Sequence, residues 1–180
     1  MLSASAHKFN GPKGIGFLYV RQGVALPAYA DGGYQEYSLR AGTENIASIV
    51  GMSKALKNNC DCLDLNQLHL RALERQLIQE LDASGISYSR LGGKNTLPGL
   101  ISLSFPKKDG EAILHRMDLK GICISTGSAC DSKRTQVSHV LSAINLDRSL
   151  AEGTIRISLG KNNTKEDVSM IAATLISIVR

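Results

Sequence analysis

The chain has 180 residues, of which 43% are hydrophobic and 21% charged, with a formal net charge of +5. This composition is ordinary for a globular protein and excludes a disordered or fibrous chain. No apolar run approaches the roughly 20 residues of a membrane span, no N-terminal targeting segment is evident, and the basic residues form no block, so we expect a cytoplasmic protein without a membrane or nucleic-acid partner.

The opening of the chain predicts a loop that enters a strand. Residues 3–14 are small, polar and glycine-rich, and the apolar residues 15–20 follow them. Small neighbours around His7 and Lys8 leave room for an anion or a flat ring, and a lysine in such a place could form a Schiff base with an aldehyde. From spacing alone, a solvated loop lysine is the more frequent outcome for Lys8.

The middle of the chain predicts two helices. An apolar-periodic run covers residues 46–56, and Thr43 is a candidate N-cap whose helix start could also bind an anion. The longest helical pattern covers residues 64–84, with leucines at three- and four-residue steps and charges between them. We expect the domain boundary between these helices, at residues 58–65.

The second half alternates strand and helix patterns and predicts a compact α+β sandwich. Residues 154–160 alternate, which places Arg156 on the face opposite Ile155 and Ile157. The last helix is expected to start at a shortened capping box, Thr164–Asp167. The other expected strands cover residues 86–89, 100–105 and 122–126, and the other helices cover residues 109–119 and 135–144. The helix at 64–84 is expected to pack on this sheet, around Ser102, Ile124 and Ile157.

The stretch 122–132 places a thiol just after a strand. A β-branched run ends in small polar residues that lead to Cys130, which predicts a strand followed by a loop. We expect residues 127–134 to be more mobile than their neighbours and Cys130 to reach solvent or a cleft, as a reactive thiol must. The alternative is a small residue packed in a loop, because unpaired cysteines are among the most buried residues.

The cysteine positions, 60, 62, 123 and 130, predict neither a disulfide framework nor a structural zinc site. No pair has the C-x-x-C spacing. Cys60 and Cys62 could hold a soft metal with His69, but two incidental cysteines near a helix end explain the pattern better on ligand count. We therefore expect no metal site.

Several segments together resemble the NifS/IscS type of cysteine desulfurase, a fold type I pyridoxal-phosphate enzyme of the class V aminotransferase group. The resemblance covers the whole chain in order. The segments that carry it are Ser5–Lys8, Gly11–Gly16, Leu39–Asn45, Ser125–Cys130 and Ile155–Gly160.

The resemblance implies a set of cofactor residues. Lys8 matches the lysine that binds pyridoxal 5'-phosphate covalently and later moves the substrate Cα proton. Ser5 and His7 match positions that bind the cofactor phosphate. Thr43 matches a threonine that reaches the phosphate of the neighbouring subunit, which implies a homodimer or homo-oligomer.

The resemblance also implies the reaction. Arg156 matches the arginine that grips the substrate carboxylate, for which a planar bidentate fork is suited. Cys130 matches the nucleophile that takes sulfur from L-cysteine, becomes a persulfide and leaves L-alanine. The sulfur would then pass to an iron–sulfur cluster scaffold or a tRNA-thiolation partner.

The chain resembles only the C-terminal portion of such an enzyme. Seven residues precede Lys8, whereas family members carry most of the cofactor domain there, including the aspartate that pairs with the pyridine nitrogen. We therefore expect residues 1–60 to be the end of the large cofactor domain and residues 61–180 the small α+β domain with the cysteine loop. Full activity of this chain alone is not expected, since the aspartate keeps the electron sink effective.

Two alternatives remain open on the sequence. One is another class V pyridoxal-phosphate enzyme, an aminotransferase or a selenocysteine lyase, and the other is a non-catalytic fragment that binds sulfur-acceptor proteins. The strand at 15–20 would expose its apolar side chains without its neighbours in the large domain. We expect residues 1–40 to be disordered or to pair with another copy of the chain.

Overall fold

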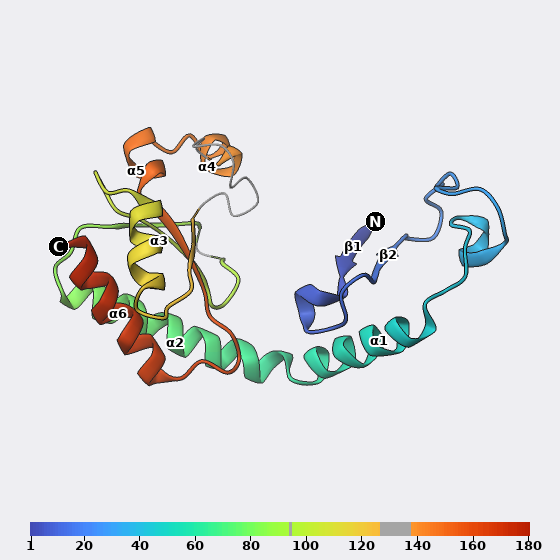
Figure 1. The fold of residues 1–180 in the computed structure, drawn as a ribbon, viewed down its shortest axis with the longest axis horizontal. Helices are drawn as coiled ribbons and strands as arrows, with labels where there is room; N and C mark the ends of the chain where they lie inside the picture. The colour runs from blue at the N-terminus through green and yellow to red at the C-terminus, as the bar shows by residue number, and fades with distance from the viewer. Residues whose placement is uncertain (94, 127–137) are drawn as a thin grey trace. The chain divides into compact units, whose positions relative to one another are not determined.

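The structure, a computed structural model, describes residues 1–93, 95–126 and 138–180 (Figure 1). It divides into two compact units, Met1–Leu63 and Asp64–Arg180. The expected mobility of residues 127–134 lies outside the described residues. Among the helices of the described part, none is long and apolar enough to cross a membrane.

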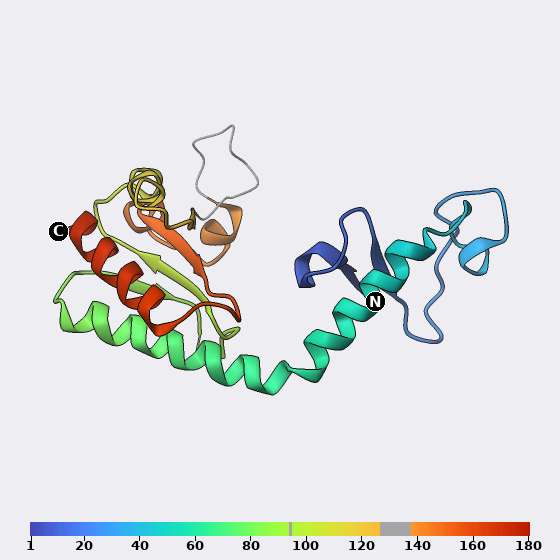
Figure 2. The ribbon, with the colours of Figure 1, turned by 60° about the horizontal axis from the view of Figure 1, so that its bottom comes forward.

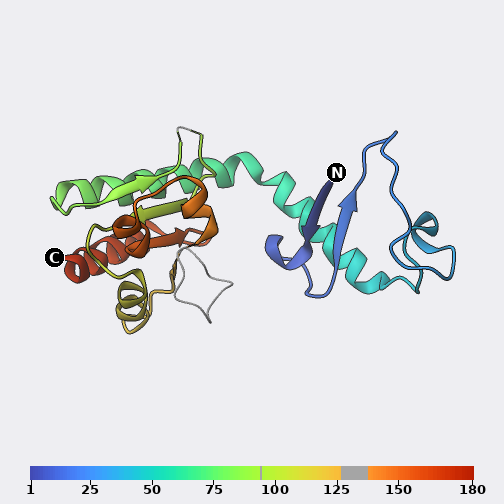
Figure 3. The same cartoon turned by 90° about the horizontal axis from the view of Figure 1, so that it is seen from above.

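The first unit opens with two antiparallel strands, β1 (Leu2–Ser5) and β2 (Gly16–Tyr19), which lie beside each other in Figure 3. The opening residues were predicted as a loop, and that prediction is wrong for β1. Serine and alanine favour strands weakly, but pairing with a neighbouring strand overrides local preference. The pairing needs Gly16, because a Cβ there would lie 2.5 Å from the Ala4 carbonyl oxygen.

A helix follows an irregular stretch in this unit. The elements are the 3-10 turns η1 (Ala6–Phe9) and η2 (Gln35–Ser38) and the helix α1 (Ile46–Asp61). The N-cap of α1 is Asn45, whose Oδ1 accepts the Ser48 N–H at 3.2 Å. Thr43 was predicted to be the N-cap of this helix, and that prediction is wrong. Thr43 stands too far from the first helical residue to reach the donors of the first turn.

The second unit contains a four-stranded sheet in the order β3-β4-β6-β5, with all neighbours antiparallel. The strands are β3 (Ser89–Leu91), β4 (Leu100–Ser104), β5 (Ser125–Thr126) and β6 (Thr154–Ser158). The helices are α2 (Leu63–Ala83), α3 (Gly110–Asp118), α4 (His139–Ala143), α5 (Arg148–Glu152) and α6 (Lys165–Val179). This is the predicted α+β architecture.

One face of the sheet carries the hydrophobic core. Ile101 and Ile157 lie opposite each other on β4 and β6 and are almost fully buried. Figure 2 shows α2 and α6 side by side, and the Gln76 amide of α2 donates to the Ser169 hydroxyl of α6 at 3.0 Å. On the other flank of α6, Arg116 of α3 donates to the Ile178 carbonyl. Helices α2, α3 and α6 therefore share one core cluster with the sheet.

Three elements differ from the sequence predictions. β5 is shorter than predicted and begins at Ser125, after Ile124. The Ile122 N–H, at the start of the predicted strand, bonds to the Met117 carbonyl at the end of α3 instead of to a strand. β3 begins at Ser89, later than predicted, where pairing with Ser104 starts. The short helix α5 had not been predicted, although its cap is local: the Asp147 carboxylate accepts the Ser149 N–H at 2.8 Å.

The capping box of α6 is expected to make stability sensitive to acid. Thr164 Oγ1 accepts the Asp167 N–H at 3.2 Å, and Asp167 Oδ2 accepts the Thr164 N–H at 2.9 Å. This backbone bond, helped by the Asn163 amide, lowers the pKa of Asp167. A lowered carboxyl pKa stabilises the fold above the unfolded pKa, and that stabilisation is lost as pH falls through the folded value.

We therefore expect Asp167→Asn to reduce the drop in Tm between neutral pH and about pH 3. Thermal unfolding followed by circular dichroism at both pH values measures this. Asp118→Asn, at the exposed end of α3, is the control and should keep the parent's drop. An unchanged drop in Asp167→Asn would contradict the expectation.

Candidate active site

Lys8 lies on a tight turn that is fixed at its base by Ala6. Ala6 is fully buried, its N–H donates to the Ile15 carbonyl at 3.0 Å, and its carbonyl accepts the Gly11 N–H at 2.8 Å. A Cβ on Gly11 would lie 2.9 Å from the Ala6 Cβ, so this position requires glycine. Asn10 ends η1 in the left-handed conformation, with φ of 67°. The hydrogen bonds of Ala6 and the left-handed Asn10 thus fix the backbone on both sides of Lys8.

Helix α1 also contacts the turn that carries Lys8. The Asn59 side-chain amide donates to the Phe9 carbonyl at 2.8 Å, and the Phe9 ring packs against Phe17 of β2 with centroids 6.5 Å apart. Close packing continues at Gly51, where a Cβ would lie 2.9 Å from the Pro12 ring. These contacts give the lysine turn a defined position within the first unit.

The turn brings together three of the predicted cofactor residues, Ser5, His7 and Lys8, and all three are exposed. Their donor set suits a phosphorylated aldehyde, since a primary amine can bond the aldehyde carbon and a hydroxyl and an imidazole can bond phosphate oxygens. Thr43 is also exposed, and within the described residues no hydrogen bond joins it to this turn. The Gly42 N–H beside it donates to the Gln35 side chain at 3.2 Å.

Arg156 lies on β6 in the second unit. Its neighbours Ile155 and Ile157 are buried in the core, so Arg156 points to the opposite, open face of the sheet and is exposed, as the alternation predicted. β6 lies between β4 and β5, and the residues that pair with Arg156 are Ser102 on β4 and Ser125 on β5. Among the described residues Arg156 has no ion pair. The guanidinium is therefore available for an anion.

β5 connects this arginine to the cysteine stretch. Ser125 pairs directly with Arg156, and the Thr126 hydroxyl donates to Glu111 of α3 at 2.8 Å on the core side of the sheet. Cys130 follows shortly afterwards in the sequence and lies outside the described residues. The strand that leads to the predicted nucleophile thus starts beside the predicted substrate arginine.

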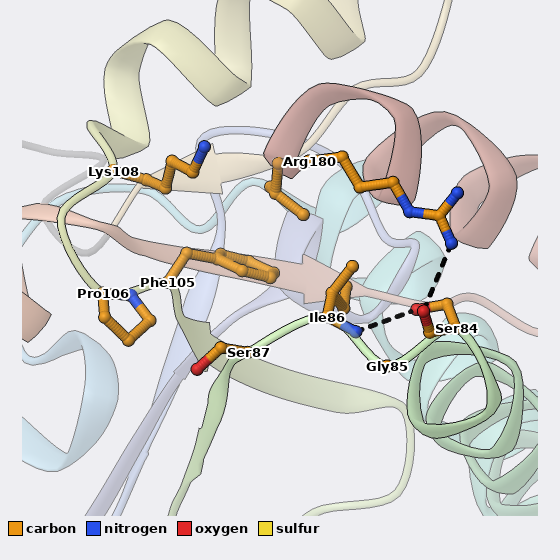
Figure 4. A pocket seen from close by; sticks show the side chains of 9 residues that line it. Ser84, Gly85, Ile86, Ser87, Phe105, Pro106, Lys108 and Arg180 are labelled. Carbon is orange, nitrogen blue, oxygen red and sulfur yellow. Dashed lines mark hydrogen bonds between the residues drawn. The ribbon is translucent and has the colours of Figure 1, made fainter.

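The second unit also contains a cavity of about 250 Å³ away from these residues (Figure 4). It lies between the turn after α2, Phe105 just after β4, and the end of α6, where Arg180 donates to the Ser84 carbonyl at 3.2 Å. Tyr88 packs on Phe105, and burial together with its bond to Asp82 raises the pKa of Tyr88 to about 12. None of the predicted site residues lines this cavity.

The other cysteines carry no metal cluster within the described residues. Cys60, Cys62 and Cys123 are free and exposed. His69, the third expected ligand of the weaker alternative, has its Nε2 2.9 Å from the Asn163 carbonyl oxygen.

The sequence alone had not indicated Asn59 or the serines beside Arg156 as site residues. Asn59 reaches Phe9 across a separation of 50 residues, and no local signal marks such a contact. Ser102 and Ser125 become neighbours of Arg156 only through the strand order of the sheet. Strand alternation could have placed each on a face but not beside the arginine.

A lysine-bearing turn followed by an α+β unit is the arrangement expected for the C-terminal part of a fold type I pyridoxal-phosphate transferase. The model of the aminotransferase class-V family matches residues 1–171. The chain belongs to this family, which confirms the predicted family and fold class.

Several similar proteins are named cysteine desulfurase or NifS-like protein. A cysteine desulfurase IscS of Dictyoglomus turgidum is 45% identical over 181 residues, covering 99% of this chain and 46% of the relative. A NifS-like protein of known structure has 36% identity and a TM-score of 0.85, covering 98% of this chain and 45% of its own. SspA in complex with cysteine has 34% identity and a TM-score of 0.64 over 90% of this chain and 44% of its own. This chain therefore spans about half the length of these relatives.

Proposed function

We propose that this chain is part of a cysteine desulfurase, which removes sulfur from L-cysteine to give L-alanine. The observation that carries the proposal is the pairing of Arg156 with Ser125, because it joins a carboxylate-binding group to the strand that leads to Cys130. The names of the relatives and the complex of one structural relative with cysteine support this substrate.

Pyridoxal 5'-phosphate is the cofactor in this proposal. Lys8 would bond its aldehyde carbon through Nζ, Ser5 and His7 would bind its phosphate, and Thr43 would reach the phosphate bound by the other subunit of a homodimer. When bound, the cofactor supplies an electron sink that stabilises negative charge at the substrate Cα. Lys8 Nζ then moves the proton at Cα.

Arg156 positions the substrate, and Cys130 takes its sulfur. Arg156 holds the substrate carboxylate with its guanidinium fork. The Cys130 thiolate attacks the substrate sulfur, forming a sulfur–sulfur bond while the carbon–sulfur bond breaks; the carbon keeps the electron pair and takes a proton. Cys130 becomes a persulfide and the product is alanine.

The persulfide would be passed to an acceptor protein, an iron–sulfur scaffold or a tRNA-thiolation partner. The acceptor, the homodimer and the cytoplasmic location expected from the sequence stay predictions. What supports these three predictions is that the chain belongs to the aminotransferase class-V family.

Replacing Lys8 with alanine is expected to abolish cofactor attachment. Pyridoxal phosphate is added to the 180-residue chain, borohydride fixes any lysine–cofactor bond, and mass spectrometry of peptides locates it. We expect attachment at Lys8 in the parent and none at this peptide in Lys8→Ala, because no other amine lies on the turn beside Ser5 and His7.

Lys13→Ala is the matched control, since Lys13 is an exposed lysine of the same loop. It should leave attachment at Lys8 unchanged. Equal labelling of both lysines, or labelling that does not saturate, would contradict a specific site. No labelling at all would favour the non-catalytic alternative.

A further inference from the structure

The open face of the sheet in the second unit carries two rows of hydroxyl side chains. In the first row Ser104 and Thr154 lie opposite each other on β4 and β6, and both are buried. Their hydroxyl oxygens are 2.6 Å apart, and Thr154 also donates to the Leu150 carbonyl at 2.8 Å. This row satisfies its own hydrogen bonds and needs no ligand.

The second row lies two residues further along the same strands and is open. Ser102 of β4 and Ser125 of β5 oppose Arg156 from its two sides. Directly opposed residues of antiparallel strands point to the same face, with Cβ atoms about 5 Å apart. The row therefore reads Ser102, Arg156, Ser125 across three strands. Both serines are half-buried and Arg156 is exposed.

Each member of this row can donate a hydrogen bond, and none carries a negative charge. In the part of the chain that the structure describes, these three side chains make no ion pair and no side-chain hydrogen bond. Glu111, the carboxylate bonded to β5, is held by Thr126 on the opposite face of the sheet. An arginine flanked by two hydroxyl-bearing residues offers hydrogen-bond donors to a carboxylate, which only accepts.

We propose that Ser102 and Ser125 form, together with Arg156, the binding site for the α-carboxylate of an amino-acid ligand. This rests on the proposed function, which assigns the carboxylate to Arg156 alone. The serines supply hydroxyl donors on both sides of the fork. Because their side chains are short, they also leave the ligand room beside the arginine.

The test is an NMR titration of the 180-residue chain with L-alanine, the expected product, and with L-alaninamide, which lacks the carboxylate. L-Alanine is expected to shift the Arg156 side-chain signal saturably, and L-alaninamide is not. Ser102→Ala and Ser125→Ala should each weaken the affinity by roughly threefold to tenfold, the effect of one lost hydrogen bond. Ser158→Ala, on the same face of β6, is the control and should keep the parent affinity.

Ser102→Thr and Ser125→Thr keep the hydroxyl on a residue that strands favour and should retain most of the affinity. Backbone amide spectra of each variant report whether it is folded, and in Arg156→Gln the shifts of these amide signals report whether L-alanine still binds. Parent affinity in both alanine variants, with binding lost in Arg156→Gln, would overturn the role of the serines and leave the proposed function standing. Parent affinity in Arg156→Gln, or no saturable shift in the parent chain, would overturn both.

Discussion

Replacing Glu74 with alanine is expected to lower the free energy of unfolding of the second unit by about 3 kcal/mol. The Glu74 side chain on α2 is 7% exposed and pairs with Arg90 of β3, and its other oxygen accepts the Gly99 N–H at 3.0 Å. Alanine leaves both donors without their acceptor, and the Gly99 N–H is buried away from water. Arg90 is 36% exposed and can recover part of its loss by turning to solvent.

The effect should extend to the open face of the sheet because Gly99 immediately precedes β4. Gly99 has φ of +78°, and its carbonyl accepts the Leu159 N–H at 2.8 Å, at the end of the pairing between β4 and β6. Register decides which side chains share a row. Glu74 thus helps to keep Ser102 opposite Arg156.

Urea unfolding of the parent and the variants, followed by circular dichroism, measures the loss. Glu74→Gln keeps an acceptor for Gly99 and should lose less than Glu74→Ala. The matched control is Glu152→Ala, which breaks an exposed ion pair with Arg148 on α5 and should cost less than about 0.5 kcal/mol. Similar losses in Glu74→Ala and Glu152→Ala would show that burial of the pair does not matter.

The intact chain is expected to self-associate through its first unit. β1 and β2 form a sheet of two strands, which is marginal by itself in water, and within the described residues neither strand has a partner on its other edge. Leu2, Leu18 and Tyr19 are 56%, 52% and 57% exposed. Open edges with apolar side chains pair with other chains.

Leu18→Lys should shift the chain toward the monomer, because a charge on an edge strand opposes strand addition. Sedimentation velocity over a range of concentrations measures the shift. Leu119→Lys is the control, since Leu119 is 85% exposed in the second unit and lies outside the strands. A parent chain that stays monomeric at every concentration would contradict the expectation.

Local patterns in the sequence were sufficient for the longest elements. The leucine spacing predicted α2 nearly to the residue, because leucines at three- and four-residue steps, such as Leu73, Leu77 and Leu81, share the buried face of the helix. The alternation in β6 placed Arg156 opposite the buried Ile155 and Ile157 for the same reason. The capping box of α6 involves only residues three apart, so it too was predictable.

Predictions failed where partners distant in the sequence decide the outcome. β1 was predicted as a loop because its own residues favour no strand, yet pairing with β2 makes it one. β5 was predicted too long because the end of α3 competes for Ile122. The cap of α1 was placed at Thr43 because the start of the helix was not known to the residue, and the start decides which side chain can cap it.

The sequence by itself determined the family, through short motifs whose order is specific, and the faces of the longest strands and helices, through their periodicity. Only the tertiary structure decided which polar residues meet. The row Ser102, Arg156, Ser125 joins three strands that are far apart in the chain, and the Glu74 site joins α2, β3 and the turn before β4. Such contacts depend on strand order and register, which the alternation of a single strand does not specify.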